Sequence, residues 1–173
     1  MSLLLRPVTD DDLLGIGDLH YRSRASAYAD ILTPEALTFG SPAALGEWWS
    51  ERWKWEADNH RMTVAIADGR LAGFTYLGPS EQDGTGELGA IHADPDFVGK
   101  GVGRALMVDA LGALTAYGYR AVLWVLEGNA RARAFYEKGG WAADGTTRVE
   151  PIGAEPVLQM RYSRGVGPGA GPA

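Results

Sequence analysis

The stretch DPDFVGKGVGRALM places three alternating glycines directly before an apolar pattern with helical spacing. A glycine inside a helix costs up to ~1 kcal/mol relative to alanine, so Gly99, Gly101 and Gly103 need a reason to stand at a helix start. Backbone N–H groups at a helix N-terminus are unpaired and carry partial positive charge. Without side chains in the way, an anion can approach them closely, and Lys100 and Arg104 add charge of the same sign. The stretch is therefore suited to binding a pyrophosphate.

Two common phosphate-binding loops do not fit these residues. A Walker A loop requires glycine where Asp94 stands and serine or threonine where Gly101 stands. The dinucleotide fingerprint requires its third glycine where Arg104 or Leu106 stands. Taken alone, the glycines also fit a connector that exposes a helix end to water, so the neighbouring sequence decides between the two interpretations.

Composition narrows the possible functions. The net charge of −6 at pH 7 argues against a general nucleic-acid binder, which needs a basic surface. The absence of cysteine excludes disulfides, thiolate metal ligands and a cysteine nucleophile, and three scattered histidines argue against a metal site. No apolar run approaches the ~20 residues that span a bilayer, and the N-terminus lacks the features of a signal peptide. We therefore expect a cytoplasmic protein with no membrane partner.

The hydrophobic pattern predicts a mixed α/β chain, with one domain over residues 1–163 and a Gly/Pro-rich tail, 164–173, that is expected to be disordered. The Asp68-Gly69 pair between two apolar runs is typical of a β-hairpin. The pattern predicts helices at 10–28, from 34, from 42, at 102–117 and at 129–138. It predicts strands at 3–6, 62–67, 71–77, 87–93, 121–126, 141–143 and 156–162, of which 62–67 and 71–77 form the hairpin and 121–126 is buried.

Two sequence blocks resemble the GCN5-related N-acetyltransferase (GNAT) family. The family's central signature is Gln or Arg, two variable residues, glycine, one variable residue, then glycine or alanine, and it falls on residues 98–103. The second block, Asn-x-x-Ala-x-x-Phe-Tyr-Glu-Lys-x-Gly-aromatic, falls on residues 129–141. The resemblance covers roughly residues 62–143. Val98 departs from the signature by replacing the Gln or Arg, which removes one side-chain contact near the phosphates.

The resemblance implies the GNAT fold, an α/β fold in which helices flank a mixed, mostly antiparallel central sheet with a splayed central strand pair. It implies acetyl-CoA as the acyl donor, with the thioester in the gap between the splayed strands, where a strand N–H polarises its carbonyl. It also implies that Asn129 contacts the cofactor arm, although capping its own helix is a competing role. The remaining implied cofactor contacts are backbone of Ile91, His92 and Ala93 along the pantetheine arm, and Gly99, Lys100, Gly101, Val102, Gly103 and Arg104 around the pyrophosphate.

The same resemblance suggests two catalytic residues, Glu87 and Tyr136. A lysine-like amine with a pKa of ~10.4 is only about one part in a thousand neutral at pH 7, so a base is useful. Glu87 opens the predicted central strand, where the family often carries that base; the alternatives are His92 or an exposed carboxylate without a role. Tyr136 matches the family's general acid for the departing thiolate. A thiol pKa of ~8.5 lies below a tyrosine pKa of ~10, so a hydrogen bond to the thiolate is as plausible as full proton donation.

The acceptor side is less determined by sequence. We expect a primary amine of a small molecule or peptide, acetylated by direct transfer in a ternary complex, and bound by the first helices and the loop at 78–86. The tryptophans of the helix from 42 suit either an aromatic wall for a cationic ligand or a core and dimer surface, since helical spacing separates them over two faces. A non-catalytic acyl-CoA-binding sensor or interaction module is the alternative function, and a nucleotide-binding regulator is a third. The four tryptophans concerned are Trp48, Trp49, Trp53 and Trp55.

Overall fold

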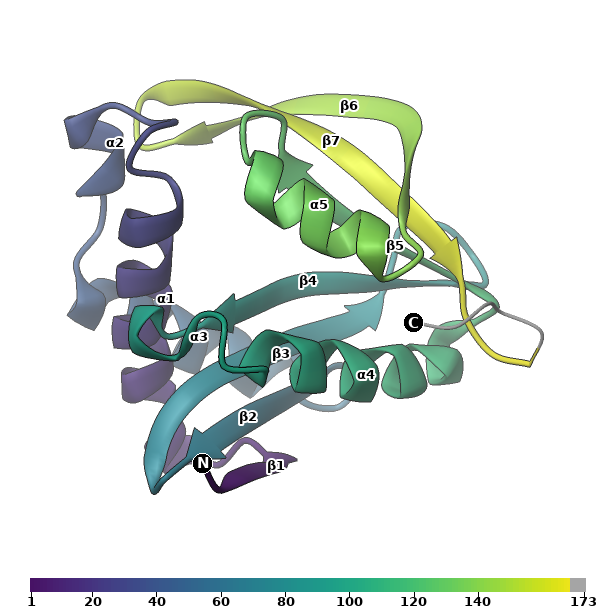
Figure 1. Ribbon diagram of the computed structural model, residues 1–173, viewed down its shortest axis with the longest axis horizontal. Coiled ribbons are helices and arrows are strands. Elements are labelled where there is room, and N and C mark those ends of the chain that lie inside the picture. Colours follow the sequence, from purple (N-terminus) through teal and green to yellow (C-terminus); the bar gives the residue numbers. More distant parts are fainter. Residues whose placement is uncertain (169–173) are drawn as a thin grey trace.

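The computed structural model of the chain describes residues 1–168. One sheet with strand order β1-β2-β3-β4-β5-β7-β6 runs through the molecule, and every neighbouring pair is antiparallel except β4 and β5 (Figure 1). The strands are β1 (Leu3–Pro7), β2 (Arg61–Ala67), β3 (Arg70–Pro79), β4 (Thr85–Ala93), β5 (Arg120–Leu126), β6 (Ala142–Ile152) and β7 (Glu155–Gly165); the helices are α1 (Leu13–Ala27), α2 (Pro34–Leu37), α3 (Pro42–Glu56), α4 (Val102–Leu114) and α5 (Ala130–Lys138), with short 3-10 helices at Asp10–Asp12, Pro95–Phe97 and Thr115–Tyr117.

The parallel pair β4 and β5 is the point where the sheet divides. The two strands pair over three residues only, and Glu87 opposite Val122 is the last pair. Beyond it β4 carries a bulge at Gly89, where its register with β3 shifts. A side chain at Gly89 would lie 3.1 Å from the Tyr76 ring, so the bulge suits a glycine. The predicted splayed strand pair is confirmed, and the two halves of the sheet separate from this point (Figure 1).

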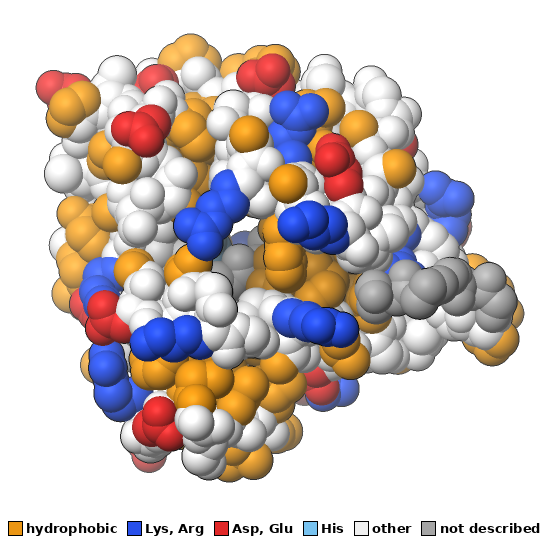
Figure 2. All heavy atoms as spheres, viewed as in Figure 1, with side chains coloured by type: hydrophobic (Ala, Val, Ile, Leu, Met, Phe, Trp, Pro, Cys, Tyr) orange, Lys and Arg blue, Asp and Glu red, His pale blue; other side chains and the backbone are white. Residues whose placement is uncertain are grey.

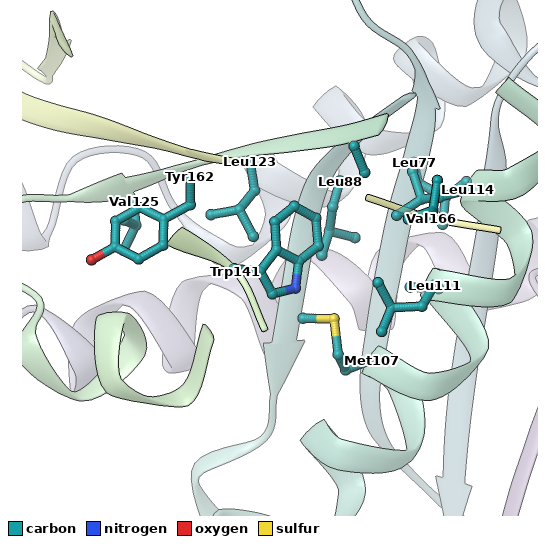
Figure 3. Packing of buried hydrophobic residues seen from close by; sticks show 12 residues of the cluster. Leu77, Leu88, Met107, Leu111, Leu114, Leu123, Val125, Trp141, Tyr162 and Val166 are labelled. Atoms are coloured by element: carbon teal, nitrogen blue, oxygen red, sulfur yellow. The ribbon is translucent and has the colours of Figure 1, made fainter. Parts of the chain in front are cut away.

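Helices α4 and α5 cover one face of the sheet, and α1 and α3 cover the other (Figure 1). On the first face the main core cluster joins α4 to β4 and β5, and Figure 3 shows the Trp141 ring between Leu88, Leu123 and Met107. On the second face, α1 and α3 touch through glycines, since a Cβ on Gly17 would lie 2.1 Å from the backbone nitrogen of Gly46. The two cores meet the sheet from opposite sides and leave its split edge accessible.

The C-terminal part of the chain differs from the sequence-based prediction. Strand β7 runs to Gly165, and Val166 is only 6% exposed because it packs into the main core cluster. The prediction of disorder from residue 164 onward is therefore wrong for residues 164–166, whereas residues 169–173 lie outside the described residues. The strand predicted at 141–143 is present but longer than predicted, because β6 begins at Ala142 and continues to Ile152.

Within residues 1–168, no helix combines the length and the apolarity needed to cross a bilayer. The longest helices, α1 and α3, each have 15 residues and carry charged side chains along their lengths. Their apolar residues pack on the sheet and on each other instead.

Candidate active site

The glycine-rich stretch forms the start of α4, as the sequence predicts. Gly101 is the N-cap residue with φ +87°, and Gly99 has φ +79°, both in the left-handed region that favours glycine. A Cβ on either residue would meet nothing within 4 Å, so the space outside the turn is open. The backbone N–H of Lys100 donates to the carbonyl of Phe97 at 3.2 Å, which leaves the N–H groups of the first turn of α4 as the available donors.

The segment before α4 is anchored to both faces of the protein. The buried Asp94 carboxylate accepts the N–H of Asp96 at 2.8 Å and pairs with the Arg22 guanidinium of α1 at 2.5 Å. Phe97 and Val102 are buried in a cluster against β2 and β3. The glycine-rich turn is therefore held in place by the protein itself, and such an ordered turn lowers the ordering cost of binding any ligand there.

A cavity of about 360 Å³ lies at the split between β4 and β5. Figure 2 shows the face of α4 and α5 with a hollow bordered by Lys and Arg side chains. Exposed cations on these two helices and the preceding turn suit the phosphates of a large anionic ligand. Six residues predicted for the site line the cavity: Glu87, Ile91, His92, Ala93, Asn129 and Tyr136.

Glu87 occupies the last paired position of β4, at the apex of the split. Burial raises the pKa of its carboxyl, the Arg148 guanidinium partly opposes the rise, the Glu81 carboxylate adds to it, and the Arg52 guanidinium opposes it to a smaller extent. A carboxylate with a raised pKa is a stronger base than a solvated one, yet it stays ionised at neutral pH more readily because of the two cations. This environment fits a general base better than it fits a solvated strand end.

Tyr136 reaches the same cavity from α5 on the opposite side of the split. Its ring packs against the main core cluster. Burial, and secondarily the neighbouring Tyr28, raises the pKa of its phenol above the ordinary value, so the proton stays on the oxygen across the physiological range. This favours a hydrogen bond to a developing thiolate over complete proton transfer.

His92 stacks between two rings of the α1 face. Its ring centroid lies 4.5 Å from that of His20 and 5.5 Å from that of Phe74, and its Nδ1 lies 3.0 Å from Ser23 Oγ. Burial lowers the pKa of His92 to about 4 and that of His20 to about 2. Both rings are therefore neutral at pH 7, and His92 is a weaker base than the sequence alone would suggest.

Residues 27–141 match the profile of the family described as acetyltransferase (GNAT). They form more than half of the chain and include both the glycine-rich start of α4 and all of α5. The chain belongs to the acetyltransferase (GNAT) family. The resemblance of the two sequence blocks to this family is confirmed.

Curated relatives of this GNAT chain match it over part of their length. It is 34% identical over 97 residues to the mycothiol acetyltransferase of Propionibacterium freudenreichii subsp. shermanii, a match that covers 54% of this chain and 30% of that protein. A mycothiol acetyltransferase of Beutenbergia cavernae is 43% identical over 75 residues, covering 43% of this chain and 25% of that protein. The matched part thus spans less than a third of these relatives.

Solved structures resemble this GNAT chain over nearly its whole length. The PaiA N-acetyltransferase of Thermoplasma acidophilum, in complex with coenzyme A, superposes with a TM-score of 0.71 at 21% identity and covers 92% of this chain and 98% of that chain. The spermidine N-acetyltransferase of Vibrio cholerae, in complex with coenzyme A and spermine, gives a TM-score of 0.71 at 22% identity, with 95% of each chain covered. These similarities confirm the GNAT fold.

The tryptophan-rich helix α3 does not form the aromatic wall that the sequence allowed. Trp49 is buried in the core, and its Nε1 donates to His20 Nδ1 at 3.1 Å. Trp48 lines the cavity at 46% exposure, whereas Trp55 is 73% exposed. Trp53 packs, partly buried, against the same core cluster as Trp49. The four rings therefore divide between core, cavity and surface, as their helical spacing requires.

Several residues that line the cavity could not be predicted from the sequence, because the elements that carry them lie far apart in the chain. Arg52 comes from α3, Tyr28 from the end of α1 and Arg148 from β6. No sequence spacing links them, so only the packing of α1 and α3 on the sheet and the return of β6 bring them to one cavity. Asn129, in contrast, was predicted from its motif; its Oδ1 caps α5 by accepting the N–H of Ala132 at 3.2 Å, and the residue also lines the cavity.

Proposed function

We propose that the protein transfers an acetyl group from acetyl-CoA to a primary amine, by direct transfer in a ternary complex. The observation that carries this proposal is that Glu87 and Tyr136 line one cavity from opposite sides of the β4–β5 split. The named activities of the relatives, among them mycothiol acetyltransferase and spermidine N-acetyltransferase, support the reaction class. They differ in acceptor, so they do not choose one for this chain.

The residues present fit acetyl-CoA, which supplies an activated acyl group as a thioester when bound. The open space outside Gly99 and Gly101 leaves room for a diphosphate against the first turn of α4. The side chains of Lys100 and Arg104 are exposed at this turn and add positive charge. Beyond the bulge, β4 has no partner on its β5 side, so the backbone of residues 91–93 is available to an extended ligand arm.

Glu87 acts as the base that removes a proton from the acceptor amine, directly or through water. Its half-buried carboxyl has a raised pKa, which is closer to the pKa of the ammonium group from which it must accept a proton. Tyr136 donates a hydrogen bond to the thiolate that leaves, since its own proton is held by the raised pKa of its phenol. The two groups act on opposite sides of the reacting centre, so neither needs to change its role during a turnover.

A thiol-release assay with acetyl-CoA and a broad panel of amines tests the proposal. We expect amine-dependent thiol release that is lost in a variant carrying both Glu87→Gln and Tyr136→Phe. Intersecting initial-rate patterns are expected for a ternary complex. Binding of acetyl-CoA without turnover of any amine would instead support the non-catalytic acyl-CoA sensor.

The cytoplasmic location and a homodimer are further expectations. Cell fractionation tests the location, and light scattering tests the oligomeric state.

A further inference from the structure

Two arginines from distant elements meet at the part of the cavity where Glu87 lies. Arg52 comes from α3 and Arg148 from β6, and both line the same cavity as Glu87. Both guanidiniums act on the Glu87 carboxyl electrostatically, yet neither forms an ion pair with it within residues 1–168. Glu81 acts on the same carboxyl with the opposite sign, and Glu56 and Glu150 lie on the outer side of the two arginines. The lining of this part of the cavity therefore combines the Glu87 carboxyl with two guanidiniums, rather than being uniformly acidic.

Each guanidinium is held in place by an aromatic ring. The Cζ of Arg52 lies 4.7 Å from the Tyr76 ring centroid and 5.0 Å from that of Trp48. The Cζ of Arg148 lies 4.1 Å from the Trp124 ring centroid. A guanidinium that contacts an aromatic ring can still use the N–H groups that point away from the ring for hydrogen bonds.

The Nη atoms of both arginines are available to a ligand. The Nε of Arg52 donates to Glu56 at 2.8 Å, and the Nε of Arg148 donates to Gln159 at 2.8 Å, with Glu150 at 4.0 Å. Among the residues that the structure describes, no acceptor bonds to an Nη atom of either side chain. Two parallel N–H donors on each planar edge match the two oxygens of a carboxylate.

The same contacts disfavour a polycationic acceptor. The Arg52 guanidinium already lies over the Trp48 ring and over the Tyr76 ring, and Tyr76 is only 2% exposed. A second cation placed next to Arg52 and Arg148 would be repelled by both guanidiniums.

We propose that the acceptor is a small amine that carries a carboxylate close to the amino group, as in a free amino acid, with the amine at Glu87 and the carboxylate at Arg52 and Arg148. This assignment rests on the proposed acetyl transfer and specifies its acceptor. The ammonium group of such an acceptor faces the negative charge of Glu87, and its carboxylate faces the positive charges of Arg52 and Arg148. In addition, the substrate carboxylate neutralises the two cations that hold down the pKa of Glu87, so its arrival strengthens the base.

Matched acceptor sets test this proposal. Each set contains an L-amino acid, its α-amide and its decarboxylated amine, and kcat/KM is measured for all three with acetyl-CoA. We expect the amino acid to be preferred by about tenfold or more, the size of a charge-assisted hydrogen-bonded pair. The α-amide is a demanding comparison because its less basic amine is more often neutral at pH 7.

Variants of the two arginines connect that preference to the structure. Arg148→Gln and Arg52→Gln are each expected to lower the ratio of kcat/KM for amino acid over amide toward one, and Arg148→Lys to restore part of it. The control is Arg120→Gln, an exposed strand arginine outside the cavity, which should leave the ratio unchanged.

The outcomes separate this proposal from the proposed function. Acetylation of amides and decarboxylated amines as fast as amino acids would overturn the acceptor assignment and leave acetyl transfer intact. Acetylation confined to peptide N-termini would also overturn it, by assigning the arginines to a protein substrate. If no amine of any kind is acetylated, the proposed function itself is wrong, and the acceptor assignment fails with it.

Discussion

The two sides of the candidate active site are built in different ways. The donor side consists of the turn before α4 and the strand β4, which follow one another between residues 85 and 104 and present mainly backbone. The acceptor side consists of the Glu87 side chain and of side chains from α1, α3, β5 and β6, some of which are more than a hundred residues apart in the sequence. A backbone site depends on glycines and dihedral angles, whereas a side-chain site depends on the packing of distant elements. The first should therefore be broken by adding a side chain and the second by exchanging one.

The largest effect is expected from Gly101→Asp on the donor side. The substitution places a β-carbon at φ +87° and a carboxylate against the site of the phosphates. We expect coenzyme A affinity, measured by calorimetry, to fall by about a hundredfold or more. Gly40→Asp is the matched control, since Gly40 also has positive φ and open space but lies outside the cavity. Normal affinity in Gly101→Asp would refute the placement of the diphosphate.

Tyr136→Phe should affect the chemical step and leave the donor bound. Removing one hydrogen-bond donor to a developing charge typically costs about a hundredfold in kcat. We expect that loss with coenzyme A affinity nearly unchanged, because the ring still packs in the core. Tyr28→Phe sharpens the test, since Tyr28 is the other phenol lining the cavity; equal losses in the two variants would contradict a specific role for Tyr136.

Glu87→Gln should break the acceptor side, with an effect that depends on pH. The wild-type rate falls as the pH drops through the raised pKa of Glu87, because protonation removes the base. The glutamine variant lacks this dependence, and its deficit, about ten- to a hundredfold, should be largest above that pKa, where the wild type carries the carboxylate. A pH-rate profile at saturating acetyl-CoA measures it. Glu35→Gln provides the control, because Glu35 is an exposed carboxylate of α2 outside the cavity. A deficit that is the same at every pH would contradict the role of Glu87 as the base.

The smallest expected effect concerns the stability of the fold in acid. His92 has a pKa of about 4 in the folded protein, against ~6.5 when unfolded. The unfolded chain therefore gains protons first as the pH falls, and folding loses stability between those two values. We expect His92→Gln to remove on the order of 1–2 kcal/mol of this loss, seen by urea denaturation at pH 7 and pH 4.5. An unchanged pH dependence would show that His20, whose pKa is lower still, accounts for it.

The same contrast explains how much of the molecule could be predicted from its sequence. The strands and helices from residue 61 to 138 follow from local periodicity, turn residues and caps, and so does the glycine turn. The hairpin of β6 and β7 could not be predicted at its full length, because β6 is an exposed strand with few apolar residues. Val166 was assigned to a disordered tail because a single apolar residue among glycines gives no periodic signal.

The residues of the candidate site also divide into those that local sequence predicts and those that only the complete fold brings together. Gly101, Glu87 and Tyr136 were found because each belongs to a motif or to a strand end. Arg52 and Arg148 could not be predicted as cavity residues, because no motif or periodic pattern in the sequence around either one indicates that its side chain faces the cavity. Their function depends on the register of β6 with β7 and on the seating of α3, both of which are properties of the whole fold.

The contact of Gly17 with Gly46 has a consequence for how this acceptor side can change during evolution. Any larger residue at Gly17 would drive α3 away from α1, since a single added carbon already overlaps the opposing backbone. The wall that carries Arg52 is thus locked at a set spacing and cannot slide to admit a bulkier acceptor. New acceptor preferences in descendants of this chain should arise by exchange of side chains on a rigid frame, and not by repositioning its helices.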